Sequence, residues 1–132
     1  MPAHFEDIET GTVVTLGEAE VDADQIATFS AAFCPGWNAA DGAPDALVFA
    51  LWSRLDQAAA ADWPQLKRLG VDALRWARNP QPGARLRGRM TVMAKDPVGE
   101  VKGIVFAQHD LLDEEGRLVF SCLTRSLFAR RP

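Results

Sequence analysis

The residues best suited to chemistry lie in one segment, FSAAFCPGWNAADGAPDALVFALW, at residues 29–52. It contains a thiol, Cys34, and two carboxylates, Asp41 and Asp45. A thiolate can act as a nucleophile and a carboxylate can take a proton from water, so acyl transfer and hydrolysis are both conceivable. Each residue also has a plainer role. A lone Cys beside a Pro is usually a small packed residue, and acids at a helix start usually meet the helix dipole, so we expect these plainer roles.

Four further side chains in the sequence have types that suit binding or catalysis. Trp37 and Asn38 follow the thiol and would either shape the mouth of a pocket or cover exposed core. His4 and His109 are the two histidines of the chain, so neither a zinc cluster nor a Ser-His-Asp constellation is visible. His109 lies inside an alternating run, where we expect a solvated or hydrogen-bonded structural role.

Composition limits the classes of partner. The chain of 132 residues fits a single domain spanning residues 1–132, and 48% hydrophobic with 24% charged residues is typical of a soluble globular protein. A net charge of −4 gives no reason to expect nucleic acid or an anionic membrane as partner. With no signal-like start and no long apolar run, we expect a cytoplasmic protein. Cys34 and Cys122 are expected to be free thiols, and no metal or cofactor is expected.

The first half of the chain predicts one strand and two helices. β-branched residues at 12–21 favour a strand, and Asp22 then starts a helix that the Cys34-Pro35-Gly36 sequence ends. A second helix begins near Pro44 and is apolar on most sides through its first half. This pattern is typical of a helix wrapped by other structure, so we interpret it as a central helix.

The second half predicts a run of antiparallel strands at residues 71–76, 86–94, 103–112 and 118–129, separated by Pro- and Gly-rich turns. Arg85, Arg87 and Arg89 alternate with apolar or small residues, so one face of their strand is expected to be solvated. The order of elements predicts an α+β protein with the hot-dog fold, in which an antiparallel sheet wraps around a central helix.

Over nearly its whole length the sequence resembles the MaoC-like dehydratases of the hot-dog superfamily. The likeness rests on FEDIETGTVV at 5–14, DADQIATFSAAF at 22–33, GVDALRWARNPQPGARLRGRMTV at 70–92 and SLFARRP from Ser126. It implies a hot-dog protomer that forms a homodimer. It also implies hydration or dehydration of an acyl-CoA or a similar acyl thioester as the family's activity.

The catalytic motif of that family is where the resemblance breaks. Its Asp and His positions read Cys34 and Ala39 here, and the glycine-rich loop that follows is shortened to residues 41–45. Hydration of an enoyl thioester needs one group to take a proton from water and another to protonate carbon, and Cys and Ala cannot replace that couple. We therefore expect no catalytic residue at the family positions. The pocket candidates that remain are Cys34, Trp37, Asn38, Asp41 and Asp45.

The resemblance also suggests a role for four arginines, because a guanidinium binds phosphate with two hydrogen bonds. Arg75, Arg78, Arg130 and Arg131 are candidates for contact with the phosphates of CoA, although a plain solvated face explains them too. We expect an acyl-thioester-binding or partner-binding protein. The alternatives are a thioesterase or hydratase using relocated residues such as Asp45 or Asp41, and a non-catalytic structural subunit paired with an active relative.

Overall fold

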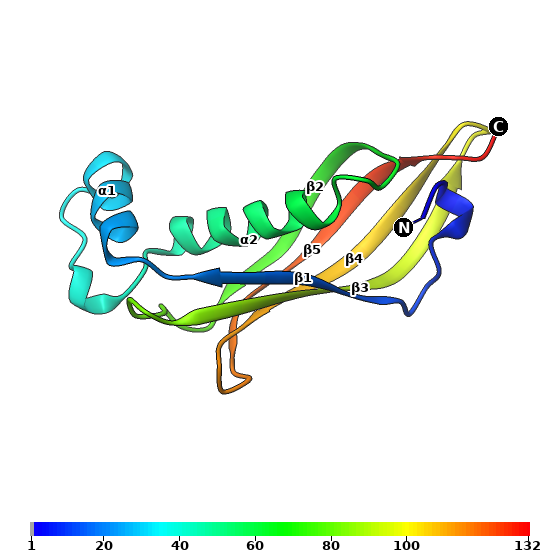
Figure 1. Ribbon diagram of the computed structural model, residues 1–132. Coiled ribbons are helices and arrows are strands. Elements are labelled where there is room, and N and C mark those ends of the chain that lie inside the picture. Colours follow the sequence, from blue (N-terminus) through cyan, green and yellow to red (C-terminus); the bar gives the residue numbers. More distant parts are fainter. Residues whose placement is uncertain (1) are drawn as a thin grey trace.

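The computed structural model describes residues 2–132 and has one five-stranded antiparallel sheet. The strands are β1 (Val13–Glu20), β2 (Gln65–Trp76), β3 (Arg85–Val98), β4 (Lys102–Leu112) and β5 (Leu118–Ala129). The helices are α1 (Ala23–Phe33) and α2 (Asp45–Ala59), with short 3-10 turns η1 (Phe5–Asp7) and η2 (Ala39–Asp41). The sheet order β1-β3-β4-β5-β2 leaves β1 and β2 at the edges (Figure 1). The predicted α+β class is confirmed.

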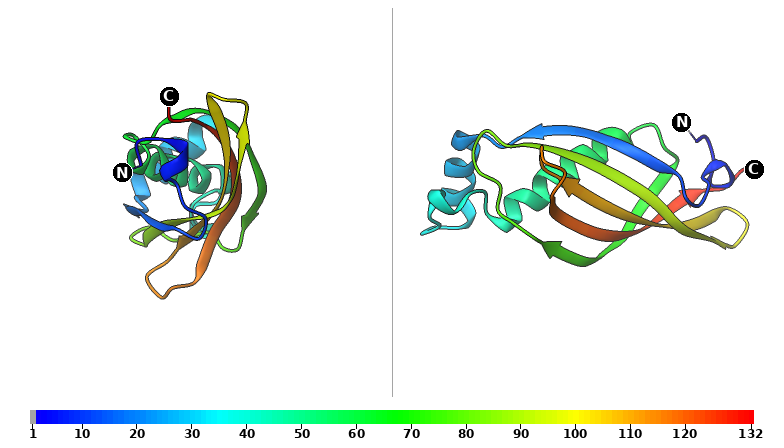
Figure 2. Two further views of the ribbon diagram at one scale, coloured as in Figure 1. Left: turned by 90° about the vertical axis from the view of Figure 1, so that its right-hand side faces the viewer. Right: turned by 90° about the horizontal axis from the view of Figure 1, so that it is seen from below.

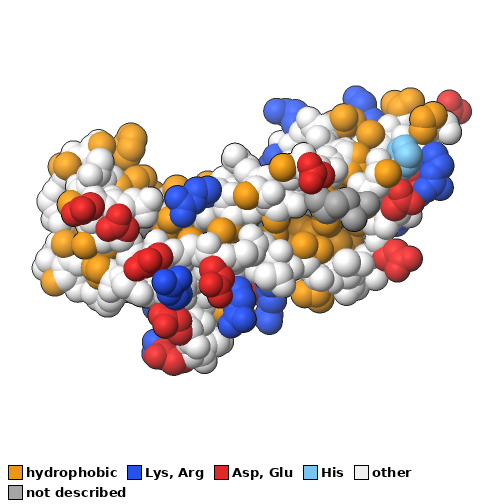
Figure 3. Space-filling model, viewed as in Figure 1, with side chains coloured by type: hydrophobic (Ala, Val, Ile, Leu, Met, Phe, Trp, Pro, Cys, Tyr) orange, Lys and Arg blue, Asp and Glu red, His pale blue; other side chains and the backbone are white. Residues whose placement is uncertain are grey.

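Helix α2 lies along the concave side of the curved sheet, as the end-on view in Figure 2 shows. Its inward side buries Leu47, Val48, Leu51, Trp52, Leu55 and Asp56. The opposite side carries exposed residues, among them Ala46, Ala50 and Ala58. The sheet therefore covers one side of α2. Figure 3, which views the molecule from the same direction as Figure 1, shows apolar side chains exposed between charged ones on that face.

Helix α1 forms and ends as its sequence predicts. The Asp22 side chain caps the helix by accepting a hydrogen bond from the Asp24 amide at 3.0 Å, and Cys34 is the C-cap residue. The helix projects from the end of the molecule opposite the chain termini (Figure 1). It buries Ile26 alone, so α1 mainly carries the loop that joins it to α2.

Two strands differ in length from their prediction. Strand β2 begins at Gln65, six residues before the predicted start, because register irregularities between β2 and β5 break the alternation that a sequence pattern needs. Strand β3 continues through Pro97 to Val98, where a turn was predicted. Pro97 lies past the last residue of β3 that pairs with β1, so its missing N–H is tolerated there. The predicted alternation at Arg85, Arg87 and Arg89 is confirmed, since all three are exposed.

Candidate functional site

The loop after α1 holds the residues singled out by the sequence, and it is folded onto itself. The Cys34 amide donates to Ser30 O at 2.8 Å, and the Cys34 carbonyl accepts from the Trp37 amide at 3.0 Å. Cys34 is half-buried and is a free thiol. Asn38 uses its side-chain oxygen to cap η2, accepting from the Ala40 amide at 3.0 Å. The polar groups of this loop are therefore largely engaged within the loop.

Trp37 fastens the loop to the chain that enters α2. Its indole Nε1 donates to Gly42 O at 2.9 Å, and the ring is half-buried. Gly42 has a φ of 90°, and a Cβ there would lie 2.6 Å from Asn79 O. Only glycine fits this position without strain, because both the backbone conformation and the space exclude a side chain. The close approach brings the loop against the β2–β3 connection.

The two carboxylates of the loop lie on the outside. Asp41 is exposed at the end of η2. Asp45 is exposed in the first turn of α2, and its Oδ1 accepts from Asn79 Nδ2 at 2.9 Å. The same amide nitrogen donates to Ala43 O at 2.7 Å, so Asn79 ties the start of α2 to the β2–β3 connection. This geometry gives Asp45 a structural contact at the helix N-terminus.

A pocket of about 240 Å³ lies between the loop and α1. It contains Cys34 and Trp37, but neither Asn38 nor the two loop carboxylates line it. The lining residues are Ile26, Ala27, Ser30, Ala31, Cys34, Pro35, Gly36, Trp37 and Ala39. None of these side chains is a carboxylate or an imidazole. The pocket where the resemblance places an acid and a base thus offers a thiol and the hydroxyl of Ser30.

The four arginines do not converge on one site. Arg75 and Arg78 are exposed near the start of α2, and Arg78 lines a pocket with Asp113, Glu114 and Glu115. Carboxylates beside a guanidinium weaken its attraction for phosphate. The other two arginines lie beyond the C-terminal end of α2, a helix of 15 residues. At 1.5 Å of rise per residue α2 is about 22 Å long, so the two pairs of arginines lie toward opposite ends of this helix.

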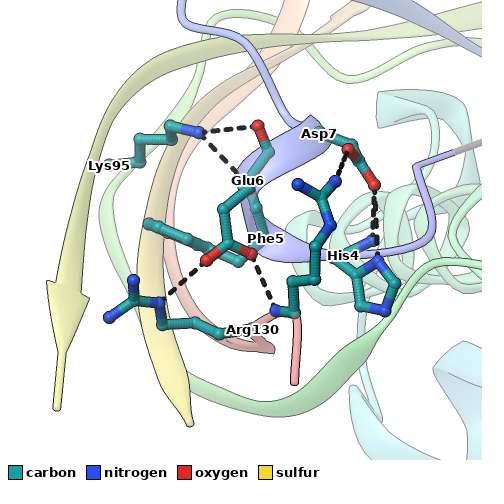
Figure 4. Close-up of polar contacts among 7 residues, drawn as sticks. His4, Phe5, Glu6, Asp7, Lys95 and Arg130 are labelled. Atoms are coloured by element: carbon teal, nitrogen blue, oxygen red, sulfur yellow. Dashed lines mark hydrogen bonds and ion pairs between the residues drawn. The ribbon is translucent and has the colours of Figure 1, made fainter. Parts of the chain in front are cut away.

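Arg130 and Arg131 hold the N-terminal segment to the end of β5 (Figure 4). Arg130 Nε donates to Glu6 Oε2 at 2.9 Å, and the Arg131 amide donates to Glu6 Oε1 at 2.8 Å. Arg131 also pairs with Asp7. These hydrogen bonds and the charge of Arg130 lower the pKa of Glu6 to about 2. Both arginines are thus committed to carboxylates of their own chain.

A second polar cluster lies inside the fold, between α2 and the sheet. Arg68 Nη2 donates to Asp56 Oδ2 at 2.6 Å, and Arg68 Nε donates to Ser126 Oγ at 2.8 Å. His109 Nε2 lies 3.0 Å from Thr124 Oγ1. His109 is fully buried, and burial together with the charge of Arg68 lowers its pKa to about 3. The imidazole is therefore neutral at ordinary pH.

Sequence reasoning missed this cluster, although the signals were present. Asp56 lies four residues after Trp52 and eight after Val48, on the buried stripe of α2. The alternation of β4 places His109 on the same face as Val105 and Ala107, which points it inward. The structural role expected for His109 stays a prediction, but its burial beside a carboxylate was not foreseen.

Comparison with solved structures shows the fold plainly. A MaoC-like dehydratase from Rhodospirillum rubrum is 23% identical with a TM-score of 0.87, covering 99% of each chain. The (R)-hydratase PhaJ1 from Pseudomonas aeruginosa is 19% identical with a TM-score of 0.72, covering 98% of this chain and 86% of its own. RV0216 from Mycobacterium tuberculosis, described as a double hot-dog fold, is 19% identical with a TM-score of 0.76, covering 98% of this chain and 44% of its own. The predicted hot-dog fold is confirmed.

Sequence comparison adds no closer relationship: no family model and no curated protein matches the chain. Within residues 2–132, no helix combines the length and apolar character needed to span a membrane. In the same range no three His, Cys, Asp or Glu side chains gather as metal ligands would.

Proposed function

We propose that this chain is a MaoC-like hot-dog protein that binds an acyl thioester and does not hydrate it. The fold supports the binding of an acyl thioester, because solved structures that share this fold include a MaoC-like dehydratase and an (R)-hydratase. A ligand of the same class is the simplest inference for this chain. Because one fold can carry unrelated functions, the residues of the site must support the function as well.

The observation that supports the absence of hydration is the lining of the pocket beside α1. Cys34 and Ala39 stand where the family's acid and base are expected, and no other lining residue supplies a carboxylate or an imidazole. General acid and base groups each contribute about 10²–10⁴-fold to rate. Without both, binding is the function that the pocket retains.

The size of the pocket favours a short acyl group. Its volume of about 240 Å³ is below the roughly 300–1,000 Å³ that is typical of small-molecule sites. Trp37 supplies an aromatic wall, and the side chains of α1 supply apolar contacts. A long acyl chain would require Trp37 to leave its hydrogen bond with Gly42 O.

We propose that the protein functions as a homodimer, paired through the edge strand β2. This strand exposes Leu66, Leu69 and Leu74, and an exposed apolar edge is usually covered by a partner. The M. tuberculosis protein described as a double hot-dog is about twice the length that this chain covers. A second copy of this chain is the partner that would supply such a pair here.

Calorimetric titration with a thioether analogue of butyryl-CoA tests the binding. The analogue cannot be hydrolysed, so heat reports binding alone. We expect saturable binding that weakens when Trp37 is replaced by Ala, with Trp76→Phe as a control aromatic outside the pocket. Absence of binding in the wild-type protein would favour the alternative of a purely structural subunit.

A further inference from the structure

The interior cluster contains a buried imidazole nitrogen without a partner. His109 Nδ1 makes no hydrogen bond to any group in residues 2–132. Asp56 Oδ1 lies 4.0 Å from this nitrogen, which is too long for a hydrogen bond. A buried polar atom that makes no hydrogen bond destabilises the fold, so an arrangement that satisfies it is favoured.

The position of the imidazole hydrogen is coupled to the direction of the Thr124 hydroxyl. The Thr124 hydroxyl has one hydrogen, which it can donate either to Ala107 O, 3.5 Å away, or to His109 Nε2, 3.0 Å away. When Thr124 donates to Ala107 O, its Oγ1 accepts from His109, and the hydrogen of the neutral ring lies on Nε2. In that arrangement His109 Nδ1 has a lone pair that faces the carboxylate oxygen of Asp56. Two acceptors that face each other repel unless a molecule with two donors lies between them.

The space around these atoms fits such a molecule. The cavity lined by Asp56, Arg68, His109, Thr124 and Ser126 has a volume of about 20 Å³, and a water needs at least about 10–15 Å³. An oxygen placed about 2.8 Å from both acceptors would see them at an angle of about 90°, close to the H–O–H angle of water. The distance between the two acceptors, the volume of the cavity and the number of donors therefore all fit one water molecule.

We propose that Asp56 Oδ1 and His109 Nδ1 form a binding site for one internal water molecule, which donates a hydrogen bond to each and joins α2 to β4. An ammonium ion offers the same donors. The Arg68 guanidinium already balances the Asp56 charge at 2.6 Å, so a second cation in this cavity would be repelled and neutral water is preferred.

The site is a bound-water site and not a catalytic centre. A water held between an imidazole lone pair and a carboxylate is arranged as in general-base catalysis. The cavity has room for one water oxygen but none for a reacting carbonyl group beside it. Its role is to satisfy the buried pair and to fix the register of α2 on the sheet, independently of acyl-thioester binding.

A crystal structure at atomic resolution, from crystals grown without ammonium salts, tests the assignment. We expect one oxygen peak at hydrogen-bond distance from both acceptors. Nitrogen chemical shifts of the His109 ring, measured by NMR, should show the Nε2–H tautomer. An Nδ1–H tautomer in direct contact with Asp56, with no peak between them, would overturn the proposal. So would a peak that forms only when ammonium is added.

Two matched variants sharpen the test. Thr124→Val removes the acceptor for Nε2–H, so we expect the ring hydrogen to move to Nδ1, bind Asp56 directly and displace the water. Ser126→Ala removes a hydroxyl that contacts Arg68 in the same cavity and should leave both the tautomer and the water unchanged. An unchanged tautomer and water peak in Thr124→Val would contradict the role assigned to Thr124.

Discussion

Arg68 on β2 and Asp56 on α2 form an ion pair inside the fold, with Nη2 and Oδ2 2.6 Å apart. The Asp56 side chain is 8% exposed and that of Arg68 is 24% exposed. The guanidinium also lies over the Trp52 ring, 5.8 Å from its centroid. This pair ties an edge strand to the central helix, beside the buried polar side chains of His109, Thr124 and Ser126.

Removal of the Asp56 carboxylate should destabilise the protein because Arg68 would be left without its partner. We expect Asp56→Ala to lower the free energy of unfolding by about 3 kcal/mol, at the low end for a buried pair because Arg68 reaches solvent. Urea denaturation measures this change. Asp72→Ala breaks the exposed pair between Arg125 and Asp72 and should cost less than about 1 kcal/mol. Equal costs for the two variants would contradict the account.

Stability should depend on pH through His109. Its pKa is about 3 in the folded protein and near 6.5 when exposed, so between these values the unfolded chain binds the extra proton. Stability therefore falls as pH decreases from about 6.5 toward 3, by at most about 1.4 kcal/mol per pH unit. Asp56 and Arg68 are the charged groups that face the ring. Urea denaturation at pH 5 and pH 7 should show a smaller difference for His109→Gln than for the wild type.

The attachment of the N-terminal segment should persist in mild acid. The pKa of Glu6 is lowered to about 2, so its carboxylate accepts hydrogen bonds from Arg130 and Arg131 until the pH falls through that value. Hydrogen exchange of the Arg131 amide at pH 4 should remain slow in the wild type. Glu6→Gln should speed it, whereas Glu9→Gln should leave it unchanged. Fast exchange in the wild type at pH 4 would contradict the attachment.

Charge on the edge of β2 should prevent pairing of two protomers. Leu66 and Leu74 are 55% and 40% exposed, and Leu66→Glu with Leu74→Glu would place like charges on both copies. Light scattering should give a dimer mass for the wild type and a monomer mass for this double variant. Val13→Glu alters the other edge strand, β1, and should remain dimeric. A monomeric wild type at micromolar concentration would contradict the proposed dimer.

Much of the fold was predictable because its signals are local. The Asp22 cap, the Cys34-Pro35-Gly36 ending and the alternation in β3 each depend on a few neighbouring residues, and all appear in the structure. The extent of β2 was not predictable. Its irregular pairing with β5, including Ala73 at a φ of 52°, removes the two-residue period on which a strand prediction depends.

The interior cluster could be predicted only in part, because its members come from four elements. Periodicity places Asp56 and His109 on inward faces, but nothing local brings Arg68 to meet them. Arg68 follows the end of α2 by a short connection, and its position depends on the pairing of β2 with β5 at Ser126. Contacts that require the whole sheet to be assembled leave no signature in a single stretch of sequence.

The central claim is that this protein binds an acyl thioester without hydrating it, and the most direct measurement is the loss of enoyl absorbance when crotonyl-CoA is added. An active (R)-hydratase serves as the positive control. We predict a rate at background for the wild type and for Cys34→Ala and Asp45→Ala, because the pocket beside α1 contains no acid–base couple. Turnover on the order of 1 s⁻¹ or faster would contradict the claim, and its loss in one of the variants would identify the residue responsible.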